Sequence, residues 1–304
     1  MTDTPEQLRS SPEGAEPGIC VVVPYFGKWP FWFPFFLKSC ARNPSITWHL
    51  HTDCGVPDGM PANVRITETS YTQYCRRVSQ TLGIDFAPDK PYKLCDLKPA
   101  LGLVHQEELA GFDFWAFGDI DVVYGDIRRY FTTDRLSGSD IFSTHRRRIS
   151  GHLCLLRNDA TMREAFMAVP DWKQLLSNKQ HVAFDESAFS RLFVRHKNWP
   201  DWLANLAKPL NRWTRRTENV EAFSTPNAGV AWHDGTKNFP DAWFWRAGRL
   251  TNARDGEREF PYLHFMAWKQ TEWPAAGMTW NSALDDVLAS DAWRISARGF
   301  AALD

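Results

Sequence analysis

The sequence predicts an α/β protein, with a mostly parallel sheet flanked by helices in a single domain that has an irregular C-terminal part. Short apolar and β-branched runs alternate with helix-like segments through the first half of the 304 residues. Parallel strands and their crossover helices follow one another in this order. The hydrophobic share of 43% indicates a sizeable core. The second half is crowded with Trp, Pro, Asn and Arg and shows neither a clear linker nor an internal repeat.

The expected elements begin with a β-branched strand over residues 19–23, which ends in the loop Pro24-Tyr25-Phe26-Gly27. A helix-like segment over residues 32–41 stops before Asn43-Pro44. The run over residues 112–117 is the strongest strand candidate, because it is almost wholly apolar. We expect further strands over residues 46–50, 63–66, 139–143 and 152–156, and helices over residues 72–82, 94–109 and 185–194.

Residues 1–18 are polar and rich in Pro, Ser, Gly and Glu, so they cannot bury much surface. We therefore expect a disordered leader over residues 1–18 and one domain over residues 19–304. The leader lacks the basic start and apolar run of a signal peptide, and the apolar run over residues 29–37 is too short to span a bilayer. Six scattered cysteines are therefore expected to be reduced thiols in a cytoplasmic protein. With 35 basic against 36 acidic residues, no nucleic-acid partner is expected.

Two aspartates, Asp119 and Asp121, directly follow the strongest strand. Residues two apart on an extended chain point the same way, and ligands of open α/β sheets bind at the carboxyl ends of the strands. Two adjacent carboxylates stay ionised when a cation lies between them, and their hard oxygen atoms suit Mg²⁺ or Mn²⁺. Solvated loop aspartates are the alternative, but charges next to a buried strand need a partner.

Other motifs occur in a matching order around this pair. They are the first strand and loop VVVPYFG, the stretch PYKLCDLKPALG over residues 91–102, and the late segment YLHFMAWK with His264 and Lys269. Together with the Asp-x-Asp they resemble nucleotide-sugar glycosyltransferases of the GT-A fold, and also an uncharacterised bacterial family of glycosyltransferase-like proteins. The resemblance implies a GT-A-like, Rossmann-related fold with a nucleotide-binding half over about 19–125 and an acceptor-side and C-terminal part over about 126–304.

The resemblance implies a metal-dependent, hexosyltransferase-like enzyme that moves a sugar from a nucleotide-diphosphate donor to a glycan or other hydroxyl acceptor. A UDP-sugar is the favoured donor, with a GDP-sugar as the alternative, and surface polysaccharide biosynthesis is the expected context. Peripheral membrane association is compatible with the expected lack of a transmembrane segment. Mn²⁺ or Mg²⁺ would be held by Asp119, Asp121 and His264, with Asp119 also meeting the ribose and Lys269 the diphosphate.

Further site residues are expected on both sides of the metal. Asp185 and Glu186 open a predicted helix, where they either cap it or bind the acceptor and take the proton of its hydroxyl group. Asp53 either forms a turn or contacts the nucleotide. The full set implied for the nucleotide comprises Tyr25, Asp53, Lys93, Asp96, Lys98, Asp119 and Lys269.

Two other functions fit part of the pattern. A haloacid-dehalogenase-like, Mg²⁺-dependent phosphatase would use Asp119 as nucleophile and Asp121 as general acid. That motif usually opens its fold, whereas about 100 structured residues are expected before it here, and the late acidic pair Asp285-Asp286 lies in a helix-like segment. The second alternative is a catalytically inactive GT-A module that only binds a nucleotide or glycan.

Overall fold

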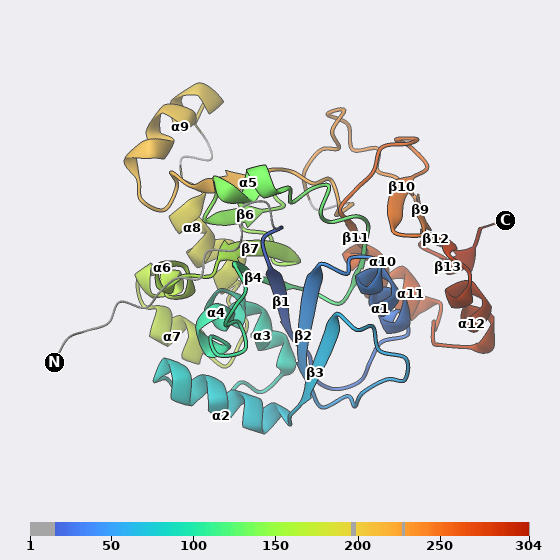
Figure 1. The fold of residues 1–304 in the computed structure, drawn as a ribbon, viewed down its shortest axis with the longest axis horizontal. Helices are drawn as coiled ribbons and strands as arrows, with labels where there is room; N and C mark the ends of the chain where they lie inside the picture. Colours follow the sequence, from blue (N-terminus) through green and yellow to red (C-terminus); the bar gives the residue numbers. More distant parts are fainter. Residues whose placement is uncertain (1–15, 196–198, 227–228, 304) are drawn as a thin grey trace.

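The computed structural model describes residues 16–195, 199–226 and 229–303 and has the expected mixed α/β class (Figure 1). Its centre is a seven-stranded sheet in the order β3-β2-β1-β4-β7-β6-β8. Strands β3, β2, β1 and β4 run parallel to one another, whereas β7 is antiparallel to both of its neighbours. The sheet is therefore mostly parallel, as expected. Residues 1–15 of the expected leader lie outside the described residues.

The strands of the central sheet lie close to their expected positions, and the sequence analysis missed only the last of them. In β1 the side chains alternate, so that Ile19, Val21 and Val23 join one apolar cluster and Cys20 and Val22 join the cluster on the opposite face. Both faces are thus covered, as is usual for parallel strands. The bounds are β1 Ile19–Pro24, β2 Ile46–Thr52, β3 Val64–Glu68, β4 Phe114–Gly118, β6 Ile141–Ser143, β7 Leu153–Arg157 and β8 Thr217–Asn219.

Short helices cover one face of the sheet. The longest, α2 (Tyr71–Leu82), starts with a capping box between Ser70 and Gln73 and ends at Gly83 in the left-handed region. The single helix expected over residues 94–109 was wrong, because Pro99 lacks an N–H group and breaks it into short turns. The short elements in this region are η1 (Pro91–Lys93), α3 (Leu94–Leu97), η2 (Lys98–Ala100) and α4 (Leu101–Val104). The later helices are α6 (Ala160–Arg163), η3 (Ala165–Ala168), α7 (Trp172–Ser177), η4 (Phe184–Phe189), α8 (Ser190–Phe193), α9 (Asp201–Ala207) and η5 (Lys208–Leu210).

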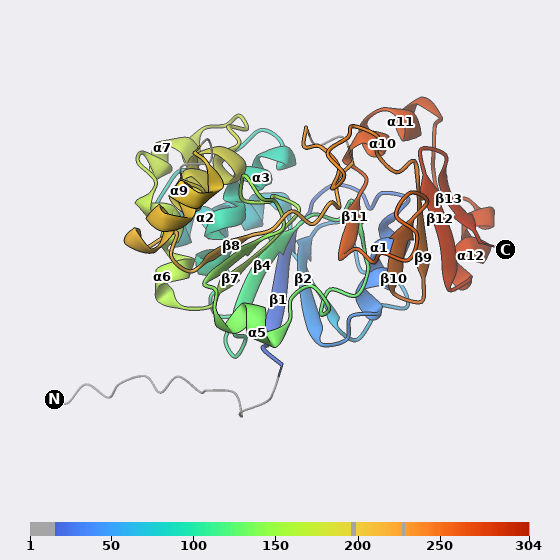
Figure 2. The same ribbon diagram turned by 90° about the horizontal axis from the view of Figure 1, so that it is seen from above.

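Helix α1 (Phe33–Ala41) packs on the other face and separates the main sheet from a second one, as Figure 2 shows. Phe33 and Phe36 face the main sheet, whereas Phe35 stacks on Phe300 of the second sheet with the ring centroids 4.0 Å apart. The short α5 (Thr133–Ser137) lies beside the main sheet on the same face, and its Leu136 joins that cluster.

The second sheet is a regular antiparallel one in the order β10-β9-β12-β13, although the sequence predicted an irregular C-terminal part. Aromatic side chains on its short strands hid the alternation, and Trp245 and Trp293 stack across β9 and β12 at 3.9 Å. The C-terminal elements are β9 (Ala242–Arg246), β10 (Arg249–Asn252), α10 (Met266–Gln270), α11 (Glu272–Ala275), α12 (Ser282–Ala289), β12 (Ala292–Ser296) and β13 (Gly299–Ala302).

Two coarse properties of the chain follow from the described residues. None of the helices there is both long and apolar enough to cross a bilayer. All six cysteines lie in this part and none is bonded to another, in line with the expected free thiols. The division into one domain over residues 19–304, with halves meeting near residue 125, stays a prediction.

A two-stranded ladder joins the two parts of the chain. Strand β5 (Val122–Tyr124), just after the aspartate pair, pairs antiparallel with β11 (Tyr262–His264). Gly125 continues the pairing by donating its N–H to the carbonyl of Pro261 at 2.9 Å. A Cβ atom at Gly125 would lie 2.3 Å from the carbonyl oxygen of Phe260, so only glycine fits without a shift of the backbone.

Gly125→Ala should therefore destabilise the protein by about 2 kcal/mol or more, because the contact is with backbone that cannot rotate away. Thermal and urea unfolding of the variant measure this loss. Gly138→Ala is the matched control: Gly138 has a φ of −82°, and the nearest atom to an added Cβ is 3.9 Å away. Equal stability of the two variants would contradict the close packing of this ladder.

Candidate active site

The topology brings six chain segments to one edge of the main sheet. Strands β1, β2 and β4 are parallel neighbours, so the residues after them, Tyr25, Asp53 and Asp119, emerge at the same edge. Strand β7 runs the opposite way, and its pairing of Leu153 with Gly118 brings the segment before it to this edge too. Strand β6 runs antiparallel to β7, and β8 runs parallel to β6. The carboxyl ends of β6 and β8 therefore reach this edge as well.

Asp121 is buried and held by two cationic or polar partners. The β5–β11 register pairs His264 with Val122, which brings its Nε2 to 3.0 Å from Asp121 Oδ2. Lys269, on α10 directly after β11, places its Nζ 2.5 Å from the same oxygen. Burial by itself would raise the pKa of Asp121, but His264 and Lys269 lower it below its ordinary value. Asp121 is therefore ionised at neutral pH.

Asp119 has a lysine of its own. Lys98 Nζ lies 2.6 Å from Asp119 Oδ1 and donates to the carbonyl of Gly151 at 2.8 Å. The Lys98 side chain is buried, which opposes its charge, but Asp119 and other nearby acidic groups raise its pKa above the ordinary value. The two carboxylates thus each have an ammonium partner from a different part of the chain.

Asp119, Asp121 and His264 are brought together as a group that is able to hold a metal ion. One ligand atom from each lies within 4.8 Å of the others. Two carboxylates and an imidazole form a mostly hard set of ligands, which fits Mn²⁺ or Mg²⁺. The geometry therefore agrees with the three metal ligands expected from the sequence, while metal binding itself stays a prediction.

Thr225 and His152 were not among the expected site residues, yet both lie behind His264. Thr225 Oγ1 lies 3.3 Å from His264 Nδ1 and 3.1 Å from His152 Nε2. The His152 and His264 rings stack with centroids 4.4 Å apart. Burial lowers the pKa of His152, so its ring is neutral. Thr225 lies 39 positions from its partner His264, and no local pattern marks it.

The first-strand loop has mostly internal contacts. Asp53 Oδ1 accepts the N–H of Gly27 at 2.8 Å and so joins the ends of β1 and β2. The Tyr25 ring stacks on Trp29 with a centroid distance of 5.5 Å, and its hydroxyl donates to the carbonyl of Lys28. Both predicted residues lie at the site edge. Asp53 is exposed and Tyr25 half-buried, and their contact with a nucleotide stays a prediction.

Lys93 and Asp96 form a buried ion pair away from this group. Their Nζ and Oδ2 atoms are 2.9 Å apart, and both side chains are almost completely buried. Asp96 also accepts the N–H groups of Val182 and Phe184 at 2.8 and 2.7 Å. This pair anchors the segment that leads into η4, and its contact with a nucleotide stays a prediction.

Asp185 and Glu186 lie on η4, which is a π-helix rather than the start of the expected α-helix. A Cβ at Gly151 would lie 3.0 Å from Asp185 Oδ2, 3.3 Å from Glu186 Oε1 and 3.7 Å from Lys98 Nζ. These acidic residues are thus next to the Lys98–Asp119 pair, and a larger residue than Gly151 would separate them. Burial raises the pKa of Asp185 to about 7, partly offset by Lys98. A carboxyl group with this pKa can exchange a proton near neutral pH.

A second group of potential ligands, His51, His105 and Glu108, lies on the helical face of the sheet. Each member except His51 already has strong protein partners. His105 Nε2 lies 2.8 Å from the Tyr74 hydroxyl, and Glu108 is paired with Arg77 at 2.6 Å. The positive charge of Arg77, next to Glu108, the only carboxylate of this group, would repel a metal ion. The group is therefore better explained as a polar network in the core.

Comparison with known proteins gives a family and several distant structural matches. A model described as a family of unknown function, DUF6625, matches residues 21–277, and no curated protein matches. The galactosyltransferase LgtC, crystallised with donor and acceptor sugar analogues, matches with a TM-score of 0.36 at 10% identity, over 68% of this chain and 74% of that chain. Mouse xyloside xylosyltransferase 1 gives 0.38 at 9%, over 69% and 86%.

The glycosyltransferase GlyE of Streptococcus pneumoniae TIGR4 gives a TM-score of 0.35 at 11% identity, and the match covers 69% of this chain and 46% of that chain. Similarity of this degree supports no statement about activity. The chemistry of the site therefore follows from its own residues.

The raised pKa of Asp185 predicts a pH-dependent stability. The folded state holds this proton up to about pH 7, whereas the ordinary value is 3.8, so the stabilisation is complete below pH 3.8 and is lost as the pH rises through 7. Asp185→Asn removes this loss. The difference in unfolding free energy, variant minus native chain, should therefore increase from pH 4.5 to pH 8 by on the order of 1–4 kcal/mol.

Urea unfolding at the two pH values measures the difference. Asp58→Asn, at an exposed position, is the control and should follow the native profile. An identical pH profile for both variants would show that Asp185 titrates normally.

Proposed function

We propose that this chain, which belongs to the DUF6625 family of unknown function, is a metal-dependent glycosyltransferase that uses a nucleotide-diphosphate sugar donor. The observation that carries the proposal is the convergence of Asp119, Asp121 and His264 at the carboxyl edge of the sheet, next to two lysines. Ligands of open α/β sheets bind at this edge. A UDP-sugar is the favoured donor, with a GDP-sugar as the alternative, and the acceptor is a glycan or another hydroxyl compound.

The charges of the site support a diphosphate ligand. Two carboxylates and the ammonium groups of Lys98 and Lys269 already balance one another. Addition of Mn²⁺ or Mg²⁺ would leave a surplus of positive charge, which a nucleoside diphosphate neutralises. When bound, the metal would supply Lewis-acid stabilisation of the charge that grows on the departing diphosphate. Lys269, with about a third of its side chain exposed, is placed to add a further positive charge.

The hydrogen bonds behind His264 are compatible with a cation in front of it. In the tautomers that suit metal binding, His152 Nε2 accepts the Thr225 hydroxyl proton and the Thr225 oxygen accepts the Nδ1–H of His264. This chain leaves a lone pair on His264 Nε2, only 3.0 Å from Asp121 Oδ2. Two such acceptors repel unless a cation lies between them. Without a metal, the ring instead donates Nε2–H to Asp121.

On the acceptor side, Asp185 is the group we assign to proton transfer. Its pKa of about 7 makes it a suitable base for an acceptor hydroxyl group, and it lies beside the Lys98–Asp119 pair. Glu186 is more exposed and pairs with Arg148 at 3.5 Å, so we assign it to binding of the acceptor. A role in surface polysaccharide biosynthesis and a cytoplasmic location remain part of this proposal.

The first test is calorimetric titration of UDP and GDP with and without Mn²⁺, on the native chain and on Asp121→Asn. The native chain should bind one of the nucleotides at least tenfold more tightly with Mn²⁺, and the variant should lose this gain, because asparagine keeps the shape but not the charge. Asp58→Asn, at an exposed site, should bind as the native chain does. No nucleotide binding under any metal, with hydrolysis of phosphate esters instead, would indicate the phosphatase alternative.

A second test addresses the hydrogen bonds behind His264. Thr225→Val keeps the shape but removes the hydroxyl, so the affinity for Mn²⁺ should fall about 10–100-fold, as for other groups that orient a metal-ligating histidine. Thr225→Ser should restore it. Titration of Mn²⁺ followed by electron paramagnetic resonance measures free ion directly, and native affinity in the valine variant would exclude this role.

A further inference from the structure

Large apolar side chains are exposed along one short stretch of the chain, around α9 and η5. Among the described residues, four of the seven exposed large apolar side chains lie within residues 199–210. Trp202 and Leu206 are each 66% exposed, and Leu210 is 87% exposed. Single exposed apolar residues are common on protein surfaces, but a group of them so close together indicates an interaction surface.

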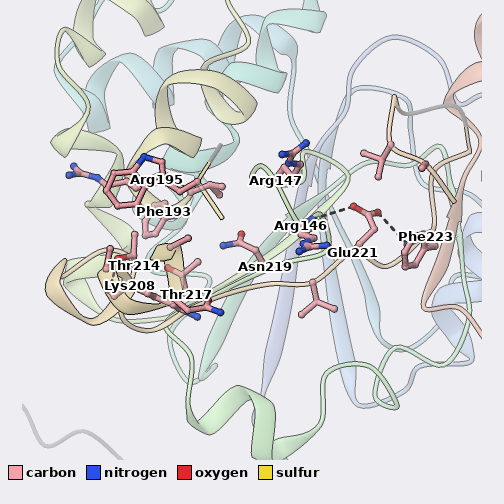
Figure 3. A pocket seen from close by; sticks show the side chains of 18 of the residues that line it. Arg146, Arg147, Phe193, Arg195, Lys208, Thr214, Thr217, Asn219, Glu221 and Phe223 are labelled. Carbon is pink, nitrogen blue, oxygen red and sulfur yellow. Dashed lines mark hydrogen bonds between the residues drawn. The ribbon is translucent and has the colours of Figure 1, made fainter. Parts of the chain in front are cut away.

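These side chains point away from the rest of the protein. Trp202 and Leu206 are four positions apart on α9, so they lie on the same side of the helix. Helix η5 continues α9 directly and carries Leu210 at its end. The other side of this segment, with Ala204 and Ala207, lines the pocket of Figure 3. Figure 1 shows α9 at the periphery of the molecule, beyond α8, so its apolar side is directed to solvent.

The same stretch is basic. Residues 202–216 contain no Asp or Glu and four cationic residues, Lys208, Arg212, Arg215 and Arg216. Two of the four have an acidic neighbour from another part of the chain. Arg216 pairs with Asp140 at 2.8 Å, and Arg212 borders a small pocket that Glu164 also lines. The other two therefore carry the surplus of positive charge.

Lys208 and Arg215 lie close to the exposed apolar side chains. Lys208 begins η5, two positions before Leu210. Thr214 Oγ1 donates to the carbonyl of Lys208 at 2.7 Å, which brings the next residue, Arg215, close to η5. Both cationic side chains are exposed, and neither forms an ion pair within the described part of the chain. Their charges are thus available to an anionic partner, although the whole chain has a net charge of −1.

This combination of side chains fits the surface of an anionic lipid bilayer better than it fits other negatively charged partners. Indole rings prefer the boundary between headgroups and acyl chains, and leucine side chains gain free energy by leaving water for the acyl region. Lysine and arginine are attracted to anionic headgroups. A nucleic acid offers no apolar phase for Leu206 and Leu210, and lysine is depleted from the centres of protein–protein interfaces.

We propose that the exposed side of α9 and η5 docks the protein on an anionic lipid bilayer. Trp202, Leu206 and Leu210 would enter the boundary between headgroups and acyl chains, while Lys208 and Arg215 would lie against the headgroups. The segment is too short to cross the bilayer, so the protein would lie on its surface. The inference goes beyond the proposed glycosyl transfer and does not depend on it, since no residue of the candidate active site takes part.

The test is density-gradient flotation of the full chain with two kinds of vesicle, one of phosphatidylcholine alone and one that also contains anionic phosphatidylglycerol. The chain should bind the anionic vesicles at least about tenfold more tightly than the neutral ones, because Lys208 and Arg215 attract the headgroups. High salt should weaken this binding by screening the charges. Equal binding to both kinds of vesicle, or flotation with neither, would overturn the inference.

Two double variants divide the apolar contribution from the electrostatic one. Trp202→Ser/Leu206→Ser removes the apolar contact and should lower the affinity for anionic vesicles at least about tenfold. Lys208→Gln/Arg215→Gln removes two charges and should lower the same affinity about tenfold or more. All four side chains are exposed, so the fold should persist, and circular dichroism checks this. An unchanged affinity in either double variant would contradict docking through α9 and η5.

Matched controls come from other parts of the surface. Val56→Ser changes an exposed apolar residue in the loop after β2, and Arg246→Gln/Arg294→Gln removes two exposed arginines from β9 and β12. Figure 2 shows the sheet with β9 and β12 at the opposite end of the molecule from α9. Both controls should bind anionic vesicles as the native chain does.

The competing occupant of this surface is a second copy of the chain, and analytical ultracentrifugation tests for it. Self-association that Trp202→Ser/Leu206→Ser abolishes, without binding to vesicles, would assign the surface to a dimer and overturn the inference. These experiments contain no nucleotide. Failure of vesicle binding would therefore leave the proposed glycosyl transfer standing, and failure of nucleotide binding would leave the docking surface standing.

Discussion

The burial of a charged carboxylate at Asp121 is the constraint on which the rest of the site depends. Only 3% of this residue is exposed, and an isolated charge there would be strongly unfavourable. His264 and Lys269 compensate it, and both come from a segment more than 140 positions later in the chain. The C-terminal part is thus required for the charge of a residue that the central sheet presents.

The β5–β11 ladder is the means by which the fold meets this constraint. The ladder fixes His264 opposite Val122, next to Asp121. The two strands can approach this closely at residue 125 only because it is glycine, since a Cβ atom there would collide with the Phe260 carbonyl. Helix α1 then packs between the main sheet and the second sheet, with Phe35 directed toward one and Phe33 and Phe36 toward the other. Packing of the aromatic C-terminal sheet therefore supports the position of His264, the proposed metal ligand on β11, which is not part of that sheet.

The antiparallel strand β7 has a comparable effect on the side of Asp119 where Asp185 lies. Because it runs against β4, the segment before it returns to the edge where Asp119 emerges, and Gly151 lies between Lys98 and Asp185. The buried Asp185, the buried Lys98 and the half-buried Asp119 are then adjacent. A purely parallel sheet would have carried this segment to the opposite edge.

The sequence by itself determined the α/β class, most of the main strands and the expectation of a site at Asp119 and Asp121, because strand periodicity and the Asp-x-Asp pattern are local properties of the chain. His264, Lys98 and Lys269 were expected only from the family resemblance, and without their partners. Only the tertiary structure decided that Lys93 and Asp96 are buried together, that Pro99 breaks a helix, and that the C-terminal part is a regular sheet. Thr225 and His152 acquire their positions through contacts 39 and more residues away, and such contacts depend on strand pairing and burial that no local pattern contains.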